Sequence, residues 1–508
     1  MSILYNEIAV FAETTPEKIS IVDSDGSFWT YQDLIRCIDD TANLLLYFSG
    51  FHQFKSVAIS SAETFHSVGL IFAVAKLELR AVTLSKSLRI NQVKDILVES
   101  ATSWLISDIQ NLGNGFLEIA RLEDFFLYKL DPTEFAGSNL VESDFPGFLV
   151  TSSSGSTGNP KPIVFSQELK SLRAAQSRDL YKVTPNDIIL NASPFSHSLG
   201  QRLTFLPLLN GATLVQLPKF SPLNWISTVR KYNVSFTICV SSHLHGLTSF
   251  LLAEDFDLAS LRCLVSSSAS LNYKIKSDLF LSENFEFHEQ YGTSEVATVT
   301  NASKSEFQLA PDSVGTRCEK VNIEIRSMNG DVCAPNTPGE IFVDSPLLCV
   351  GYLKSGLLKS ATGGGNWFGT SDLGFIDNGG RLFFLGRTKD VISVGGQNLF
   401  PMDVERVILE CSDIVECCVV EKDDDYFGQI PVAFLVSEIR SVELLGIVRD
   451  LVSLKLAPYQ HPFHYIWVDE LPKLNSGKID KASLRFHANT QLRNDGRRLI
   501  NGTKISDE

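Results

Sequence analysis

The sequence predicts an α/β fold: a large N-terminal domain of βαβ sheets plus a hairpin-rich β portion, followed by a small mobile α+β C-terminal domain. Three observations lead to this prediction. Strand-like and helix-like segments alternate over most of residues 16–310, turn sequences become frequent after residue 310, and a second alternation begins at Asp390. At 508 residues the chain is too long for one hydrophobic core, so more than one domain is expected.

The N-terminal alternation indicates a parallel sheet. The segment YQDLIRCIDDTANLLLYF has apolar residues at helical spacing, and the apolar runs VAIS and AVTL that follow it have the length and composition of strands. The order strand, helix, strand returns in GATLVQL, PLNWISTVRKYNV and SFTICV over residues 211–240. Because a helix that joins two neighbouring strands leaves them parallel, we expect a parallel sheet here.

The remainder of the chain predicts hairpins and then a small domain. Turn sequences occur as NG at 329–330, PG at 338–339 and NGG at 378–380. From Asp390, strands are expected at VISVGG, VECCVV, IPVAFLV and FHYIWV, and helices over MDVERVILEC and LLGIVRDLVSL. We therefore predict a large domain over 1–386, a hinge at 387–390, a small domain over 391–486 and a polar tail at 487–508.

Charge and composition exclude several classes of protein. The formal net charge is −15, and we find no basic stripe, so a nucleic-acid-binding protein is not expected. The N-terminal segment lacks the basic flank and apolar run of a secretory signal, and no apolar stretch reaches membrane-spanning length. We expect a cytoplasmic protein.

The cysteines agree with a reducing compartment. There are nine of them, an odd number and scattered, which favours free thiols over a disulfide framework. Cys417 and Cys418, near Cys411, form the only cluster. Since neither a paired CxxC nor a histidine at metal-ligand spacing accompanies them, they are predicted to be buried strand positions rather than a metal site.

A glycine-rich loop, TSSSGSTGNPKP at residues 151–162, lies between the apolar runs GFLV and IVF. Its composition suits a flexible connector, but a connector between domains seldom joins two strands. Glycine and serine amides followed by a lysine instead suggest phosphate binding. The spacing of Gly155, Gly158 and Lys161 differs from a Walker loop, and the prolines on either side of the lysine prevent an immediate helix. The loop is therefore predicted to be a strand, loop, strand clasp.

The loop SSGSTGNPK resembles the phosphate loop of the adenylate-forming superfamily, which includes acyl-CoA synthetases, peptide-synthetase adenylation domains and firefly luciferase. Four further blocks resemble that family in its own order: YGTSE at 291–295, TSDLG at 370–374, GRTKDVISVGGQNLFPMDVE at 386–405 and LPKLNSGKID at 471–480. The order of the blocks, more than any single one, supports the resemblance, which covers residues from about 16 to 486. The segment PFSHSLG is most similar to stand-alone acyl-CoA synthetases.

The resemblance implies a set of site residues. Lys478, Thr157, Glu295 and His197 are the expected catalytic residues, and Glu295 with Thr157 would hold magnesium. Residues expected to bind the nucleotide, or the pantetheine arm of the acceptor, are Ser153, Ser154, Gly155, Ser156, Thr157, Gly158, Lys161, Ser267, Ser268, Ala269, Tyr291, Gly292, Thr293, Ser294, Asp372, Arg387, Lys389, Gly395 and Gly396. Near the acyl pocket and the adenine we expect Ser241, Ser242, Ser266 and Gln290.

Five of these residues also have a plainer interpretation. A lone glutamate such as Glu295 is usually solvated, and Asp372 would suit the cap of a turn. Lys478 by composition alone is a surface lysine, and Gly395 with Gly396 would suit the turn at the end of a strand. The sequence by itself leaves these alternatives open.

The reaction that the resemblance implies has two halves and uses ATP, Mg²⁺, and CoA or phosphopantetheine. A carboxylic acid attacks the α-phosphorus of ATP to give acyl-AMP and pyrophosphate, and a thiol then takes the acyl group. Lys478 would serve the first half, and rotation about a hinge at Lys389 would prepare the second. His197 would gate the acyl pocket. Because Phe195 is followed by Ser196 where amino-acid-activating domains carry aspartate, a non-amino acid is expected.

Three readings remain at this point. The first is a ligase that makes a CoA thioester of a small-molecule carboxylic acid, and the second is an adenylating ligase that loads a separate acyl carrier protein or an amine. The third is an inactive nucleotide-binding homologue. It is motivated by Pro162, Ser371, Ser267 and Ser268, which stand where the family has glycines. The identity of the acid stays open.

Overall fold

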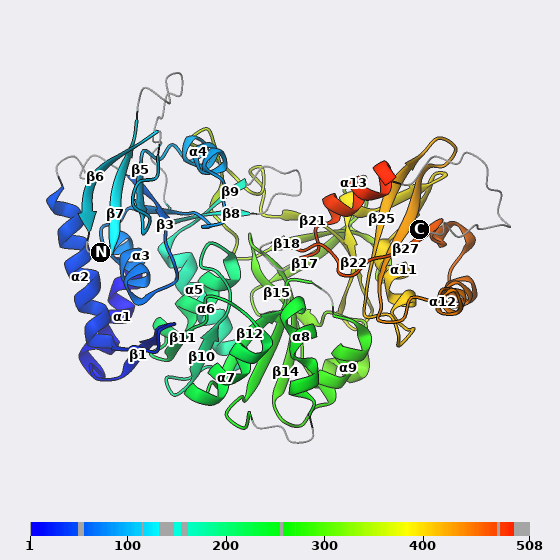
Figure 1. The fold of residues 1–508 in the computed structure, drawn as a ribbon, viewed down its shortest axis with the longest axis horizontal. Coiled ribbons are helices and arrows are strands. Elements are labelled where there is room, and N and C mark those ends of the chain that lie inside the picture. The colour runs from blue at the N-terminus through cyan, green and yellow to red at the C-terminus, as the bar shows by residue number, and fades with distance from the viewer. Residues whose placement is uncertain are drawn as a thin grey trace. The chain divides into compact units, whose positions relative to one another are not determined.

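The structure is a computed structural model that describes residues 2–48, 55–113, 115–122, 124–131, 147–153, 161–253, 258–269, 271–474 and 478–491. The chain forms two compact units (Figure 1). The first unit comprises Met1–Ser267, Ser282–Val299 and Asp344–Phe368, and the second comprises Ser268–Leu281, Thr300–Val343 and Gly369–Glu508. The predicted α/β class is confirmed. The predicted boundary at 387–390 stays a prediction, and most of the predicted tail, residues 492–508, lies outside the described residues.

One sheet of the first unit carries the glycine-rich loop. Its nine strands lie in the order β20-β19-β9-β8-β4-β3-β5-β7-β6. Their bounds are β3 Ser56–Ser60, β4 Arg80–Thr83, β5 Trp104–Ser107, β6 Phe116–Leu122, β7 Phe125–Leu130, β8 Leu149–Ser153, β9 Lys161–Phe165, β19 Gly351–Lys354 and β20 Leu357–Lys359. The predicted strands VAIS and AVTL are β3 and β4, and they pair in parallel as expected.

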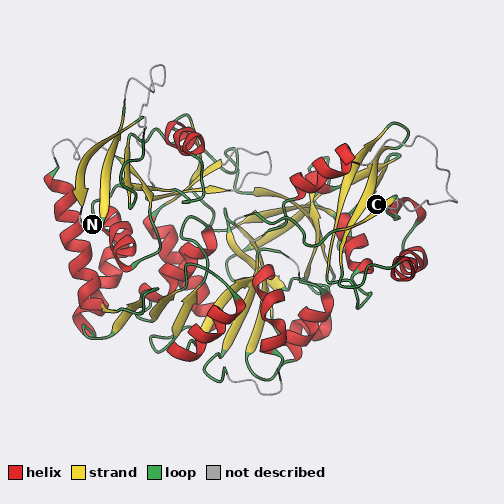
Figure 2. Cartoon of the chain, in the orientation of Figure 1, coloured by secondary structure: helices red, strands yellow, loops and turns green. Residues whose placement is uncertain are grey.

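Four helices near the start of the chain, drawn among the red helices of Figure 2, contribute apolar residues to the buried clusters of the first unit. They are α1 Ile3–Thr14, α2 Tyr31–Tyr47, α3 Phe65–Lys76 and α4 Ile90–Glu99. Helix α2 begins at a capping box, in which Thr30 and Asp33 each bond the other's backbone amide, and it buries Leu34, Ile38 and Leu45 at helical spacing. Periodicity therefore located α2 correctly.

The second sheet of the first unit follows the predicted strand, helix, strand order. Its strands lie in the order β14-β13-β12-β10-β11-β1-β2, and β15 continues beyond β14. All pairs from β1 through β14 are parallel except the edge pair β1–β2. The strands are β1 Ile19–Val22, β2 Phe28–Thr30, β10 Ile188–Asn191, β11 Thr213–Gln216, β12 Phe236–Val240, β13 Cys263–Ser267, β14 Glu286–Thr293 and β15 Ala297–Ala302. The helices are α5 Gln167–Tyr181, α6 Ser198–Leu208, α7 Pro222–Tyr232 and α8 Ser241–Leu251.

The second unit contains two antiparallel-rich sheets, in the orders β17-β18-β21-β22 and β24-β23-β26-β25, and β27 pairs in parallel with β26. The strands are β16 Thr316–Arg317, β17 Asn322–Arg326, β18 Gly339–Asp344, β21 Phe368–Ile376, β22 Leu382–Arg387, β23 Ile392–Val394, β24 Gln397–Leu399, β25 Glu416–Asp424, β26 Gly428–Val436 and β27 His464–Trp467. The helices are α9 Tyr273–Leu281, α10 Lys304–Leu309, η2 Thr388–Asp390, α11 Pro401–Ile408, α12 Val442–Lys455, η3 Pro458–Gln460 and α13 Lys481–Gln491.

Cys417 and Cys418 lie on β25 and are buried, as predicted from their sequence setting. Burial raises the pKa of both thiols, which keeps them protonated at neutral pH. All nine cysteines are free. Among the described residues, no helix combines the length and hydropathy needed to cross a bilayer.

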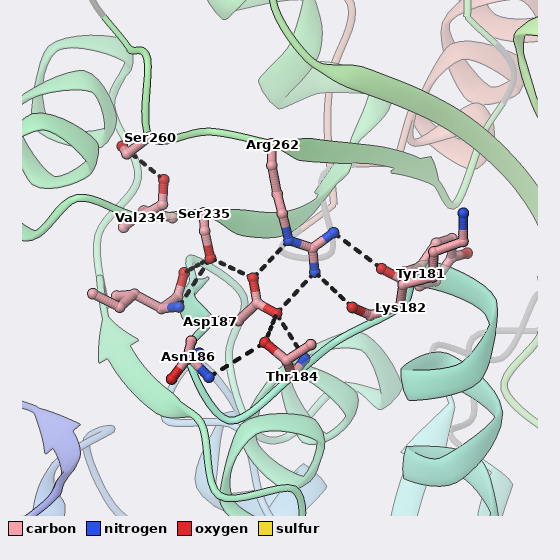
Figure 3. A network of polar contacts seen from close by, with 10 residues as sticks. Tyr181, Lys182, Thr184, Asn186, Asp187, Val234, Ser235, Ser260 and Arg262 are labelled. Atoms are coloured by element: carbon pink, nitrogen blue, oxygen red, sulfur yellow. Dashed lines mark hydrogen bonds and ion pairs between the residues drawn. The ribbon is translucent and has the colours of Figure 1, made fainter.

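An ion pair between the buried Asp187 and the partly exposed Arg262 joins three segments at the base of the second sheet (Figure 3). The Asp187 carboxylate accepts hydrogen bonds from Arg262 at 2.7 and 2.9 Å, from the Thr184 amide at 2.7 Å and from the Ser235 hydroxyl at 2.7 Å. Burial alone would raise the pKa of Asp187, but these bonds outweigh it and lower the pKa. The pair therefore stabilises the fold above the unfolded-state pKa of an aspartate, and this contribution is lost as the pH falls through the lowered value.

We expect Asp187→Ala to lower the free energy of unfolding by about 3 kcal/mol, because the Arg262 guanidinium loses its carboxylate and keeps only the main-chain carbonyls of Tyr181 and Lys182. The value lies at the low end for a buried pair, since 36% of the Arg262 side chain is exposed and water can take up part of the loss. Urea unfolding followed by circular dichroism measures this. In the matched control Asp179→Ala, which breaks an exposed pair with Arg178, the change should stay within about 0.5 kcal/mol. Equal losses in both variants would contradict the prediction.

Candidate functional site

The glycine-rich loop connects two adjacent strands, as the sequence predicted. Strands β8 and β9 pair antiparallel, and the last pair before the loop is Ser153 opposite Lys161. Lys161 is exposed at the start of β9. This geometry excludes the strand, loop, helix arrangement of a Walker loop. The predicted phosphate-binding residues Ser154, Gly155, Ser156, Thr157 and Gly158 lie outside the described residues.

The side chain of Gln201, on α6, connects the root of this loop to the segment that carries His197. Its amide nitrogen donates to the Thr151 hydroxyl at 2.7 Å and to the Phe195 carbonyl at 3.0 Å, and its oxygen accepts from Lys170 at 2.7 Å. The residue is fully buried. The two predicted blocks are thus tied together by one side chain.

His197 immediately precedes α6, and its backbone amide donates to the Pro194 carbonyl at 3.0 Å. The last residue of the PFSHSLG segment, Gly200, has to be a glycine, because a Cβ atom there would lie 2.1 Å from the Pro194 oxygen. Any side chain at this position would therefore displace the turn that holds His197.

The YGTSE block forms the end of β14 and the connection to β15. Tyr291, Gly292 and Thr293 belong to the strand, and Ser294 and Glu295 follow it. A Cβ atom on Gly292 would lie 1.8 Å from the Ala297 oxygen, so the turn closes only over a glycine.

The carboxylate and backbone of Glu295 are fixed by contacts from several elements. The Tyr352 hydroxyl donates to Oε1 of Glu295 at 2.9 Å, and the Cys349 amide donates to its carbonyl at 2.7 Å. The buried Arg173 guanidinium donates to the Ser294 carbonyl at 3.0 Å and also to the Glu295 carbonyl. Burial raises the pKa of Tyr352, and the charge of Glu295 raises it further, so the hydroxyl stays a donor at neutral pH.

These residues fit a magnesium ion. A carboxylate is a hard oxygen ligand of the kind Mg²⁺ prefers, and Tyr352 orients it by engaging one of its two oxygens. Glu295 would hold the ion, which when bound would neutralise phosphate charge. Thr157, the second predicted ligand, lies outside the described residues.

Asp372 and Arg387, predicted to bind the ribose and phosphates, lie next to each other in the second unit. They occupy opposite positions on β21 and β22, and the Arg387 Nε atom is 3.4 Å from Oδ1 of Asp372. Asp372 is buried and Arg387 is exposed. The pairing brings an acceptor for hydroxyl groups and a planar cationic donor to one edge of the hairpin.

Two serines that the resemblance places where the family has glycines adopt the left-handed backbone conformation. Ser371 has φ of 60° and Ser268 has φ of 85°. That region favours glycine, so both serines are held there at a conformational cost. Ser267 ends β13, and Ala269, which follows Ser268, is exposed.

The predicted hinge residue Lys389 lies in the short 3-10 turn η2, between β22 and β23. The neighbouring Asp390 is bonded to Arg485 of α13 at 2.7 Å and lies 3.5 Å from Lys481. Burial alone would raise the pKa of Asp390, but these cations outweigh it and lower the pKa. One side of the turn is therefore anchored within the second unit.

Gly395 and Gly396 form the two-residue turn between β23 and β24, where Val394 pairs with Gln397. Their φ angles are 56° and 85°, which is the pattern of a type I′ hairpin turn. A Cβ atom on Gly396 would meet nothing within 4 Å. The plainer interpretation, a turn at the end of a strand, is therefore sufficient to explain why glycines occupy both positions.

Lys478 lies at the base of a short bridge in which Lys473 pairs with Ile479. Its carbonyl accepts from the Leu474 amide at 2.8 Å, and the residue is partly buried. The backbone on the C-terminal side of the predicted catalytic lysine is therefore ordered by local hydrogen bonds.

Comparison with known proteins now identifies the family. The protein-family model for the AMP-binding enzyme matches residues 8–353 of the sequence. The family model for the AMP-binding enzyme C-terminal domain matches residues 403–478. The chain belongs to the AMP-binding enzyme family. An uncharacterized acyl-CoA ligase of Bacillus subtilis is 27% identical over 484 residues, which is 93% of this chain and 96% of that protein.

Solved structures show the same fold as this AMP-binding enzyme. An anthranilate CoA ligase in complex with anthranoyl-AMP has a TM-score of 0.82 at 21% identity, covering 96% of this chain and 97% of that one. An O-succinylbenzoate coenzyme A synthetase from Bacillus subtilis, in complex with ATP and magnesium ion, has a TM-score of 0.76 at 23% identity, covering 95% and 99%.

The sequence did not reveal which residues position the predicted site in this AMP-binding enzyme. The predicted blocks are contacted by Arg173, Gln201 and Tyr352, none of which belongs to a motif. Arg202, which also lies outside the motifs, donates to Gln290. The available signal was weak: in α5 and α6, polar residues occupy inward positions at helical spacing, where a core residue is usual.

Proposed function

We propose that this AMP-binding enzyme activates a non-amino carboxylic acid with ATP, giving acyl-AMP and pyrophosphate, and then transfers the acyl group to the thiol of CoA. The observation that carries the proposal is the Glu295 carboxylate, held by Tyr352 and by the Arg173 clamp on its backbone. The carboxylate of Glu295, held at the position of the family's magnesium ligand, would place the metal ion that phosphoryl transfer requires.

The roles of the other residues follow from charge. The loop at 153–161 would hold the β- and γ-phosphates through backbone amides, and Asp372 would accept the ribose hydroxyls. Arg387 would bind ribose or phosphate with its planar donors. Lys478 would lie against the carboxylate and the α-phosphate, where two anions must approach each other. None of these roles requires a nucleophilic side chain, so positioning and charge neutralisation carry the reaction.

The acceptor that we propose is the thiol of CoA. We favour CoA because the Bacillus subtilis relative, which matches over 96% of its own length, is named an acyl-CoA ligase. A separate acyl carrier protein or an amine would use the same acyl-AMP, and Gly395 with Gly396 would leave room for a pantetheine arm in either thiol case. A cytoplasmic location stays a prediction.

Acid-dependent exchange of pyrophosphate into ATP tests the first half reaction. We expect exchange that requires both Mg²⁺ and an added carboxylic acid, tested over a panel of aryl, short, medium and long acids. Absence of exchange with the whole panel would favour an inactive nucleotide-binding protein. Thioester formation with CoA, measured against a panel of carrier proteins and amines, then distinguishes the acceptors.

Lys389→Pro should spare acyl-AMP formation and slow transfer to the thiol by on the order of 10²-fold, because a stiffened turn would misplace the small domain for the second half reaction. Single-turnover measurements of the two steps check this. Lys389→Ala is the matched control, since it removes the charge and leaves the backbone free. Equal loss of both steps in the proline variant would count against a rotation about this residue.

A further inference from the structure

A cysteine, a glutamate and a histidine lie together at one end of the second sheet of the first unit. Cys263 is the first residue of β13, and Glu286 and His288 are the first and third residues of β14. The Cys263 Sγ atom, a Glu286 carboxylate oxygen and a His288 ring nitrogen all lie within 4.8 Å of one another. Three side chains of the kinds that bind transition metals therefore converge on one point.

The register of the sheet explains why these three side chains share a face. Strands β13 and β14 are parallel neighbours, with Cys263 opposite Glu286 and Val265 opposite His288. Opposite residues of paired strands project to the same face of a sheet, and successive residues alternate between the two faces. Glu286 and His288, two positions apart, thus lie on the face of Cys263, and strand pairing holds the group together.

Two members of the group are buried and one reaches the surface. Cys263 is fully buried in an apolar cluster, and the buried His288 ring packs edge-on against Tyr181, with 5.3 Å between the ring centroids. The Glu286 side chain is 51% exposed, and its Oε1 atom lies 3.1 Å from Nε2 of His288. The packed thiol and imidazole would need little reorganisation to bind an ion, which can enter past the exposed carboxylate.

The charges around the group suit a divalent cation. Arg262, next to Cys263 in the chain, is paired with Asp187 at 2.7 Å, so its positive charge is already compensated (Figure 3). Glu286 brings one negative charge, and a thiolate would bring a second. Burial raises the pKa of the Cys263 thiol to about 12, so the thiol proton passes to solvent when the sulfur–metal bond forms.

The chemistry of the three side chains selects the metal. Mg²⁺ and Ca²⁺ take oxygen ligands and gain little from a thiolate or an imidazole. Zn²⁺ binds cysteine sulfur, histidine nitrogen and carboxylate oxygen alike, and it prefers a tetrahedral arrangement. Three protein ligands leave one tetrahedral position for a water molecule, which the exposure of Glu286 permits.

The group lies at the end of the sheet opposite the predicted reaction centre. It occupies the amino ends of β13 and β14, whereas Ser267 and Thr293 occupy their carboxyl ends. His288 and Thr293 are five residues apart on β14, which in a strand corresponds to about 16 Å. The predicted magnesium ligand Glu295 follows the end of that strand. An ion bound at the amino ends would therefore link two strands and take no part in the reaction.

We propose that Cys263, Glu286 and His288 bind one Zn²⁺ ion, with a water molecule in the fourth position, and that this ion links the amino ends of β13 and β14. The site goes beyond the proposed function, since no step in the activation of a carboxylic acid by ATP requires it. The plainer interpretation is a core thiol beside an ion pair at the surface, and in that case the protein retains no metal at this group.

The metal content of the untagged full-length protein tests the proposal. After treatment with EDTA, addition of excess zinc sulfate and gel filtration, mass spectrometry of the metal should find one zinc per chain, and a large excess of Mg²⁺ should not displace it. With Co²⁺ in place of Zn²⁺, the protein should show a sulfur-to-cobalt charge-transfer band in the near ultraviolet. Retention of no zinc, or a cobalt spectrum without this band, would overturn the site.

Two ligand variants make the test specific. Cys263→Ser and Glu286→Gln should each weaken zinc binding, measured by competition with a chelator, by about 100-fold or more. That estimate is conservative because changes to residues that only orient a ligand already cost about 10- to 100-fold in affinity. Glu286→Gln replaces an exposed side chain, so it keeps the test valid if Cys263→Ser does not fold. Wild-type affinity in Glu286→Gln would contradict the assignment.

Two controls exclude other sites. Cys239→Ser removes a buried thiol of the neighbouring strand β12; Cys239 pairs with Ser266 and so lies on the other face of the sheet from Cys263. This variant and Glu295→Gln should bind zinc as the wild type does. Loss of zinc in Glu295→Gln would place the ion at the predicted magnesium ligand and overturn the proposal. Pyrophosphate exchange is measured separately, so failure of either the zinc site or the proposed function leaves the other standing.

Discussion

Lys478→Ala is expected to slow acyl-AMP formation by on the order of 10²-fold or more. In the first half reaction a carboxylate must approach a phosphate that is already negative, and a positioned ammonium group offsets that repulsion. Transfer of the acyl group from preformed acyl-AMP to CoA should be much less affected, because no second anion has to be brought in. Rapid-quench measurement of each half reaction checks the difference.

The matched control is Lys473→Ala. This lysine belongs to the same short bridge, but its ammonium group is engaged with Glu416 at 2.8 Å on the surface. Both half reactions should proceed normally in that variant. A Lys478→Ala enzyme that made acyl-AMP at the normal rate and failed only at the thioester would show that the lysine has been given the wrong role.

Glu295→Gln is expected to reduce acyl-AMP formation by on the order of 10²-fold and to raise the Mg²⁺ concentration needed for half-maximal rate. The glutamine oxygen can still accept the hydrogen bond of Tyr352, and the Arg173 and Cys349 contacts reach only the backbone. The variant therefore removes the charge and keeps the local structure. Titration with Mg²⁺ at saturating ATP and acid measures the effect.

Two further variants separate charge from orientation at this position. Tyr352→Phe keeps the Glu295 carboxylate but removes its hydrogen bond, so a smaller loss is expected, with the same shift in Mg²⁺ dependence. Glu286→Gln removes an exposed carboxylate at the start of β14, the strand that precedes Glu295, and with zinc absent should behave as wild type. If the Mg²⁺ dependence of Glu295→Gln matched wild type, the assignment of the metal ligand would fail.

Local patterns predicted most of the fold. The helix α2, the strands β3 and β4 and the clasp formed by β8 and β9 could all be predicted because periodicity, capping and proline placement act over short distances. Element ends were less accurate. The sequence suggested a helix over residues 402–411, whereas helix α11 runs Pro401–Ile408. It begins one residue earlier because proline fits the first position of a helix.

The contacts that shape the candidate site could not be predicted in this way. Arg173 and Glu295 are 122 positions apart, and Tyr352 and Glu295 are 57 apart. Their meeting depends on how α5, the end of β14 and β19 pack, which no local pattern encodes. Family motifs indicate the groups that are expected to face ligands, whereas the residues that orient those groups carry no comparable signature.

The hairpin turn at Gly395 and Gly396 bears on how the second half reaction can be studied. Both backbones are in the left-handed region, so an ordinary alanine would distort the turn before any added methyl could obstruct an incoming arm. The mirror-image residue avoids this confusion, because D-alanine favours that region. A semisynthetic protein with D-alanine at position 396 would keep the turn and add only bulk, so its rate of thiol acylation would report steric access alone.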